Sequence, residues 1–293
     1  MIEYSKDNLV SALKAIGLKA GDIVLISTEL FTLGKLTGAK SKEEHAQMIL
    51  DAIFEVITDK GTVAVNAFTT YTARYGQPFD YNHSKPITGS FCEYVTFHPR
   101  SVRSMHPINS VAAIGHQAKD ICLNASASNY GWDSPYERML RLKAQVLRLG
   151  IDYTHNTFLH VIEALYGVPY LYNKIIDAEV IVDGKKSNKQ FLASVRYLDF
   201  ELNYCMDKVK EAIHRAQCVH SCVLGAGFIH RVDTNEYCHQ LVKLLRKDPY
   251  VFLKESPAFV KGKIPWDGIT AGRDGVTQSA DYNFETAKQT FKK

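Results

Sequence analysis

His160 and Glu163, three residues apart, are the side chains of this chain best suited to acid–base chemistry. Asn156 is well placed to cap a short helix, and Gly167 with Pro169 ends it near Tyr166. Residues three apart share a helix face, so the carboxylate can hold one ring nitrogen while the other accepts a proton from a substrate. The positive end of the helix dipole favours the neutral imidazole that a base requires. The alternative is a solvated His–Glu pair on an ordinary surface helix.

The segment before this helix, residues 146–151, is short and apolar, which predicts a buried strand. The pair then lies just beyond the carboxyl end of a strand, where open α/β sheets bind their ligands. Earlier, apolar runs at 22–26 and 62–68 flank an amphipathic helix that starts at Ser41, with Glu44 completing a capping box. This order predicts a βαβ unit with two parallel strands.

The pattern as a whole predicts an α/β fold with a largely parallel central sheet flanked by helices. We expect further helices at 6–16, 89–95, 207–216 and 234–246, and a strand with a hairpin turn at 178–184. From about residue 171 the character changes to a smaller mixed α+β portion. No internal repeat or linker marks a domain boundary.

The composition is that of an ordinary globular protein, with 293 residues, 46% hydrophobic and 23% charged. We expect a cytoplasmic protein, because there is no signal peptide or membrane-length apolar run, and the six scattered cysteines suit reduced thiols. The net charge of +4 is small and dispersed, so we predict no nucleic-acid or membrane partner. Such a balance suits phosphate-bearing ligands better than polycations.

Two polar segments are candidate anion sites. The loop at 27–38 combines hydroxyls, Gly34 and Lys35 ahead of a helix, although Lys35 is followed by Leu36, so it is no Walker A loop. The segment at 100–115 carries two arginines, several hydroxyls and the stiff His106–Pro107 pair. Each is either an anion-contacting segment or an ordinary polar loop.

A group of cysteines and histidines raises the question of zinc: His214, Cys218, His220 and Cys222. The C-x-x-C pairing of structural zinc sites is missing, and a strand with small buried residues explains the same segment. We therefore predict no metal.

Three segments, in this order, resemble the aminoglycoside 3-N-acetyltransferase family, also called antibiotic N-acetyltransferases. The first is the strand and loop at 24–34 with 61–63 and 68–69. The second, at 102–115, is close to the family's R-S-x-H-P-x-x-S-x-A-A-x-G. The third joins Leu147-Arg148-Leu149-Gly150 to residues 156–163, close to the family's L-L-G and N-T-S-L-H-x-x-E. The combination is specific, whereas no single segment is.

The resemblance implies acetyl transfer from acetyl-CoA to a sugar amine on the family's own α/β fold, distinct from the commoner acetyltransferase (GNAT) superfamily. By the family's motif His160 is the general base, Glu163 orients it and Asn156 supports it. We expect one domain over 1–293, with a core of about 1–170 and a portion of about 171–293 that contributes to the acceptor cleft. The residues expected to hold coenzyme A are Ser27, Thr28, Leu33, Gly34, Lys35, Thr69, Ser104, His106 and Ser110.

The expected mechanism is direct transfer in a ternary complex, since none of the six cysteines sits in a motif with a base. Where antibiotic-modifying relatives carry an acid in G-H-D-S-N-T, this chain has Thr154. We therefore favour a nucleotide-linked (dTDP or UDP) amino deoxysugar of surface-polysaccharide (lipopolysaccharide or O-antigen) biosynthesis as the acceptor, with an aminoglycoside antibiotic as the alternative. A metal-dependent hydrolase and a non-catalytic binder of coenzyme A or sugar nucleotides stay open, and we expect a monomer or homodimer.

Overall fold

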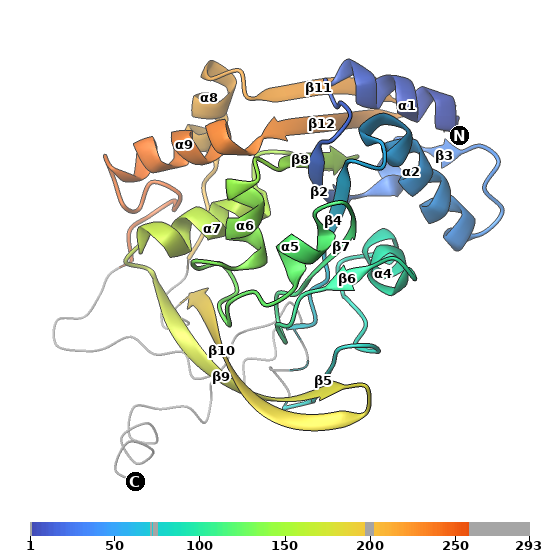
Figure 1. Ribbon diagram of the computed structural model, residues 1–293. Coiled ribbons are helices and arrows are strands. Elements are labelled where there is room, and N and C mark those ends of the chain that lie inside the picture. The colour runs from blue at the N-terminus through green and yellow to red at the C-terminus, as the bar shows by residue number, and fades with distance from the viewer. Residues whose placement is uncertain (1, 71, 73–75, 197–201, 258–293) are drawn as a thin grey trace, which may run out of the picture.

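The computed structural model describes residues 2–70, 72, 76–196 and 202–257. Within these residues, seven strands form the main sheet, which runs through the upper half of Figure 1. Their order across the sheet is β11 (Val219–Leu224), β12 (Gly227–Asp233), β8 (Gln145–Leu149), β2 (Ile23–Thr28), β4 (Thr62–Asn66), β7 (Val111–Gly115) and β6 (Val102–Arg103).

The parallel part of the sheet is its centre, where β2 pairs with β8 on one side and β4 on the other. Helix α2 (Lys42–Ile57) connects β2 to β4, which confirms the predicted βαβ unit, and the Ser41 hydroxyl caps it by accepting from the Glu44 N–H. The outer pairs, β4–β7, β7–β6, β8–β12 and β12–β11, are antiparallel. Short turns join β6 to β7 and β11 to β12, and a parallel pair would need a long crossover. The α/β class is confirmed, but the sheet predicted to be largely parallel is mixed, with parallel pairs only at its centre.

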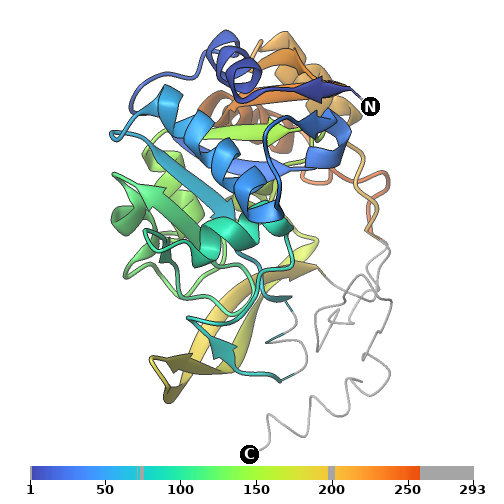
Figure 2. The same ribbon diagram turned by 90° about the vertical axis from the view of Figure 1, so that its right-hand side faces the viewer.

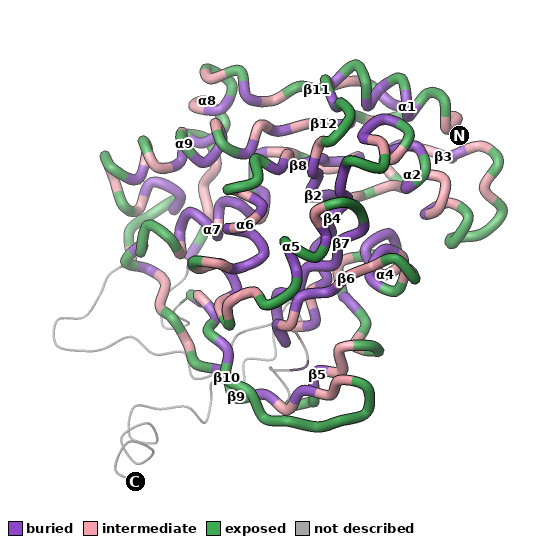
Figure 3. Tube along the Cα trace, viewed as in Figure 1, coloured by how far each residue is buried: buried purple, intermediate pink, exposed green. Residues whose placement is uncertain are grey.

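Helices cover both faces of the main sheet, because successive residues of its strands point to opposite sides (Figure 2). Val24 and Ile26 pack against α1 (Lys6–Ala15), α2 and α4 (Ser90–Phe97). Leu25 faces the other layer, where the helices are α5 (Ala118–Cys122), α6 (Pro135–Arg141), α7 (Thr157–Tyr166), α8 (Asp207–Arg215) and α9 (Thr234–Leu245). The strands between these layers are buried along most of their length (Figure 3).

A long hairpin lies below the main sheet in Figure 1 and forms a second sheet. It consists of β9 (Leu171–Val182) and β10 (Lys185–Arg196), and β5 (Phe79–Asp80) pairs with β9. The predicted turn at Asp183–Gly184 is confirmed, with both residues at positive φ, as a tight two-residue hairpin requires. The C-terminal portion expected from residue 171 therefore divides between the two sheets, because β11 and β12 extend the main one.

A third, two-stranded sheet joins β1 (Glu3–Tyr4) to β3 (Lys35–Leu36), which follows the short 3-10 helix η1 (Leu30–Leu33). Across the described ranges, the helices are too short or too polar to cross a membrane.

Candidate active site

A pocket of about 650 Å³ opens at the carboxyl ends of the three parallel strands. Ser27 and Thr28 end β2, Asn66 ends β4, and Arg148 lies near the end of β8; all four line the pocket. The loop after β8 and the start of α7 complete this wall and bring His160 into it. The pocket therefore lies where the sequence placed the ligand crevice.

Helix α7 begins and ends where its sequence signals predict. The Asn156 side-chain oxygen accepts from the Phe158 N–H at 3.0 Å, and Gly167 takes the left-handed conformation at φ 77° that ends the helix. The apolar face of the helix packs into the core, which fixes its rotation. As a result His160 keeps a third of its side chain exposed to the pocket, whereas the Glu163 side chain is fully buried.

Three donors converge on the buried Glu163 carboxylate. The Tyr170 hydroxyl donates to Oε1 at 2.7 Å, the Tyr204 hydroxyl donates to Oε1 at 2.9 Å, and His160 Nδ1 lies 2.7 Å from Oε2. Burial and the neighbouring carboxylate raise the pKa of both phenols, so they stay protonated as donors. Since a carboxylate only accepts, the ring proton of a neutral His160 sits on Nδ1, and Nε2 is left as the proton acceptor.

A second imidazole lies beside the first. His155 Nε2 is 3.4 Å from His160 Nε2, and the His155 ring packs against Tyr204 with ring centres 5.3 Å apart. Desolvation and then the neighbouring His160 lower the pKa of His155, which favours the neutral form of its ring. Sequence reasoning did not single out this residue.

A chain of hydrogen bonds runs from the core to the start of α7. The Tyr136 hydroxyl donates to Asn66 Oδ1 at 2.8 Å, and Asn66 Nδ2 donates to the Thr157 hydroxyl at 3.1 Å. Because the Thr157 oxygen accepts from Asn66, its own proton is available to donate into the pocket that it lines. Together with the helix start, Thr157 supplies a place where negative charge is stabilised.

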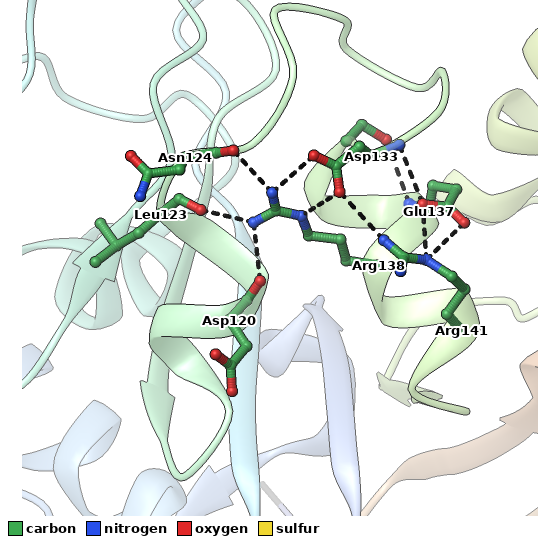
Figure 4. A network of polar contacts seen from close by, with 8 residues as sticks. Asp120, Leu123, Asn124, Asp133, Glu137, Arg138 and Arg141 are labelled. Carbon is green, nitrogen blue, oxygen red and sulfur yellow. Dashed lines mark hydrogen bonds and ion pairs between the residues drawn. The ribbon is translucent and has the colours of Figure 1, made fainter.

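Tyr130 forms another wall, with its ring centre 6.0 Å from that of His160. Its segment is anchored by Arg138 of α6, which donates to the carbonyls of Leu123 and Asn124 and bonds the Asp133 carboxylate through two nitrogens (Figure 4). The guanidinium thus joins the beginning and the end of the segment that carries Tyr130. Arg138 is therefore a structural support for the pocket.

The residues predicted to hold coenzyme A do not all lie in the same pocket. Ser27 and Thr28 line the pocket, whereas Leu33 is buried, and Gly34 and Lys35 border a separate hollow. Lys35 pairs with Glu3 at 3.2 Å, and a Cβ on Gly34 would lie 2.3 Å from the Ile2 carbonyl oxygen. The glycine is thus explained by its close approach to the N-terminal strand.

The other four predicted coenzyme A residues, Thr69, Ser104, His106 and Ser110, are buried and bonded to protein groups. The hydroxyls of Thr69 and Ser110 donate to the Pro107 and Ala67 carbonyls, and the Ser104 hydroxyl accepts from the Val111 N–H. His106 Nδ1 accepts the backbone N–H groups of Ile108 and Asn109, at 3.2 and 3.1 Å. These side chains shape the turn between β6 and β7, and their contact with coenzyme A stays a prediction.

Two groups of side chains that the sequence singled out are bonded to other groups of the protein. The guanidinium of Arg103 is buried and donates to the backbone carbonyls of Tyr81, Ser84 and Ala67. It therefore links these segments of the backbone inside the protein. In the possible zinc group, the Cys218 thiol donates to the Ile213 carbonyl and His214 bonds the Tyr153 hydroxyl. Within the described part of the chain, no three His, Cys, Asp or Glu side chains are gathered as metal ligands.

The fold and the site together describe an α/β protein with a His–Glu pair at a pocket at the carboxyl ends of its parallel strands. The family model described as aminoglycoside 3-N-acetyltransferase matches residues 25–246, and the chain belongs to this family. It is an N-acetyltransferase.

Individual relatives agree with this assignment. A prophage-derived aminoglycoside N(3')-acetyltransferase-like protein of Bacillus subtilis, YokD, is 28% identical over 64% of this chain and 74% of its own. Aminoglycoside N(3)-acetyltransferase VII of Streptomyces paromomycinus is 26% identical over 64% of this chain and 69% of its own. The structure of AAC-IIIb with CoASH has the same fold, with a TM-score of 0.70, 20% identity, and coverage of 87% of this chain and 100% of that one.

Proposed function

We propose that the protein transfers the acetyl group of acetyl-CoA to an amino group of an aminoglycoside, with His160 as the general base. The observation that carries this is the geometry of His160, whose Nδ1 lies 2.7 Å from the buried Glu163 carboxylate while its ring lines the pocket. The relatives named above support an aminoglycoside acceptor, which the sequence offered only as its alternative. The nucleotide-linked amino sugar has no support from the comparisons.

The reaction begins with the free-base amine, which attacks the thioester carbonyl carbon. As the C–N bond forms, His160 Nε2 takes a proton from the nitrogen, a step that typically contributes about 10²–10⁴ in rate. The carbonyl oxygen becomes negative, and the Thr157 hydroxyl at the start of α7 is the donor for it. The C–S bond then breaks, the amide leaves, and the coenzyme A thiolate takes the proton from His160.

A covalent acetyl-cysteine is not needed in this scheme. Cys92 lines the pocket, but its side chain is buried and burial raises the pKa of its thiol to about 11. A thiol with such a pKa stays protonated at neutral pH and is a poor nucleophile. The chemistry of Cys92 therefore favours direct transfer.

The experiment is a thiol-release assay with acetyl-CoA, run with gentamicin, with a dTDP-linked amino sugar and without acceptor, and followed by mass spectrometry. We expect gentamicin to gain one acetyl group and nuclear magnetic resonance to place it on the 3-amino group. Turnover of the nucleotide-linked sugar, with none of gentamicin, would restore the acceptor that the sequence favoured.

A further inference from the structure

The proton-accepting nitrogen of the base, His160 Nε2, has the ring of His155 as its neighbour. His160 Nδ1 is committed to Glu163, so a neutral His160 can engage His155 only as an acceptor through Nε2. His155 Nε2 must then be the donor, in a long hydrogen bond of 3.4 Å between the two nitrogens. The low pKa of His155 keeps its ring neutral, so this contact carries no like-charge repulsion.

The backbone around His155 is held from several sides. Arg148, on β8, donates through Nε to the Asp152 carbonyl at 2.8 Å and through a terminal nitrogen to the His155 carbonyl at 3.3 Å. The Tyr237 hydroxyl donates to the Thr154 carbonyl at 2.9 Å. The side chain of His155 is exposed and contacts the rings of His160 and Tyr204.

An imidazole beside a thioester can take a proton from water in place of an amine. In that side reaction the base takes a proton from water, the oxygen attacks the carbonyl carbon, and the C–S bond breaks to give acetate and coenzyme A. An acetyltransferase that binds acetyl-CoA first can lose the acetyl group to water before its acceptor binds. A hydrogen-bond donor on the free nitrogen of the base occupies the lone pair that would otherwise accept a proton from water.

We propose that His155 donates a hydrogen bond to the base and thereby suppresses hydrolysis of acetyl-CoA until an acceptor is bound. An acceptor makes many contacts with the pocket and can turn the His155 side chain aside with that binding energy, whereas one water molecule cannot. This inference rests on the proposed acetyl-CoA chemistry at His160, but not on which amine is the acceptor.

The test is the rate of acceptor-independent thiol release from acetyl-CoA, with acetate measured directly. We expect His155→Ala to raise this rate about three- to tenfold, the range that corresponds to one neutral hydrogen bond. His155→Phe keeps a ring against Tyr204 without an N–H donor, and it should show the same rise if the alanine variant folds poorly. Adding His160→Ala to either variant should abolish the increase, because the leak uses the same base.

The matched control is His230→Ala. His230 packs on Tyr153 of the same loop, with ring centres 4.8 Å apart, but does not line the pocket. Its variant should leave hydrolysis unchanged, whereas a rise there would show that loosening the loop suffices and would overturn the proposal. Unchanged hydrolysis in folded His155→Ala and His155→Phe that still acetylate an amine would also overturn it. If no tested amine is acetylated but a His160-dependent leak appears, the acceptor assignment fails and the capping role stands.

Discussion

Glu163→Gln is the substitution that most sharply separates orientation of the base from simple packing. The side chain keeps its volume in a fully buried position, and its carbonyl oxygen can still accept from Tyr170 and Tyr204. The amide nitrogen is then turned toward His160 Nδ1, which lies 2.7 Å from the oxygen it replaces. Because that amide is a donor, His160 must present a bare Nδ1 and carry its proton on Nε2.

In this tautomer the nitrogen that faces the substrate cannot accept a proton. We expect kcat to fall about 10²–10⁴-fold, the same range as for loss of the base itself, which is about 2.7–5.5 kcal/mol of transition-state stabilisation. The free energy of unfolding should change by less than about 1 kcal/mol, because the buried hydroxyls keep their acceptor. The assay is steady-state thiol release with gentamicin, combined with chemical denaturation and with calorimetry of acetyl-CoA binding.

The reasoning is refuted if Glu163→Gln keeps kcat within about threefold of wild type while binding acetyl-CoA normally. A second variant distinguishes the loss of orientation of His160 from a loss of packing. Glu163→Ala leaves the two tyrosine hydroxyls without their acceptor, so it should also lose about 1–3 kcal/mol of stability for each buried group. Equal stability loss in the Gln and Ala variants would mean that the amide is not accommodated as described.

Further predictions concern the supports of the pocket. Asn156→Ala removes the acceptor for the Phe158 N–H, and urea denaturation should show a loss of about 1 kcal/mol. Arg138→Ala frees the segment that carries Tyr130, so steady-state kinetics should show a higher KM for the acceptor and calorimetry a lower melting temperature. Complete burial lowers the pKa of His106 to about 4, so the unfolded chain binds a proton there first and stability falls as the pH drops from about 6.5 toward 4. In His106→Asn, whose oxygen can accept the same backbone N–H groups, up to about 3 kcal/mol of that loss should disappear from unfolding curves measured across this range.

The local elements were predictable because their signals lie close together in the sequence. Asn156 and Gly167 act on the backbone within a turn of themselves, and α7 begins and ends where they predict. The βαβ unit followed from the same kind of information. The antiparallel flanks did not, because strand partners are chosen by contacts between distant segments, as in the pairing of β12 with β8.

Of the contacts in the site, the sequence predicted only the one between His160 and Glu163. His160 and Glu163 are neighbours on one helix, so their spacing revealed the pair. Tyr170 and Tyr204 reach Glu163 only because the chain folds back past α7, and no spacing signals such a meeting. Residue type also misled: Gly34 suited a phosphate loop, but the structure explains it by the close approach of Ile2.

The most direct test of the central claim is the acetyl-transfer rate of His160→Ala at saturating acetyl-CoA and gentamicin, with acetyl-CoA affinity measured in parallel. If the pocket-facing nitrogen of His160 removes the proton from the amine, kcat falls by about 10²–10⁴ while acetyl-CoA binds as in wild type. A folded His160→Ala protein that acetylates gentamicin at a rate within about threefold of wild type would contradict it.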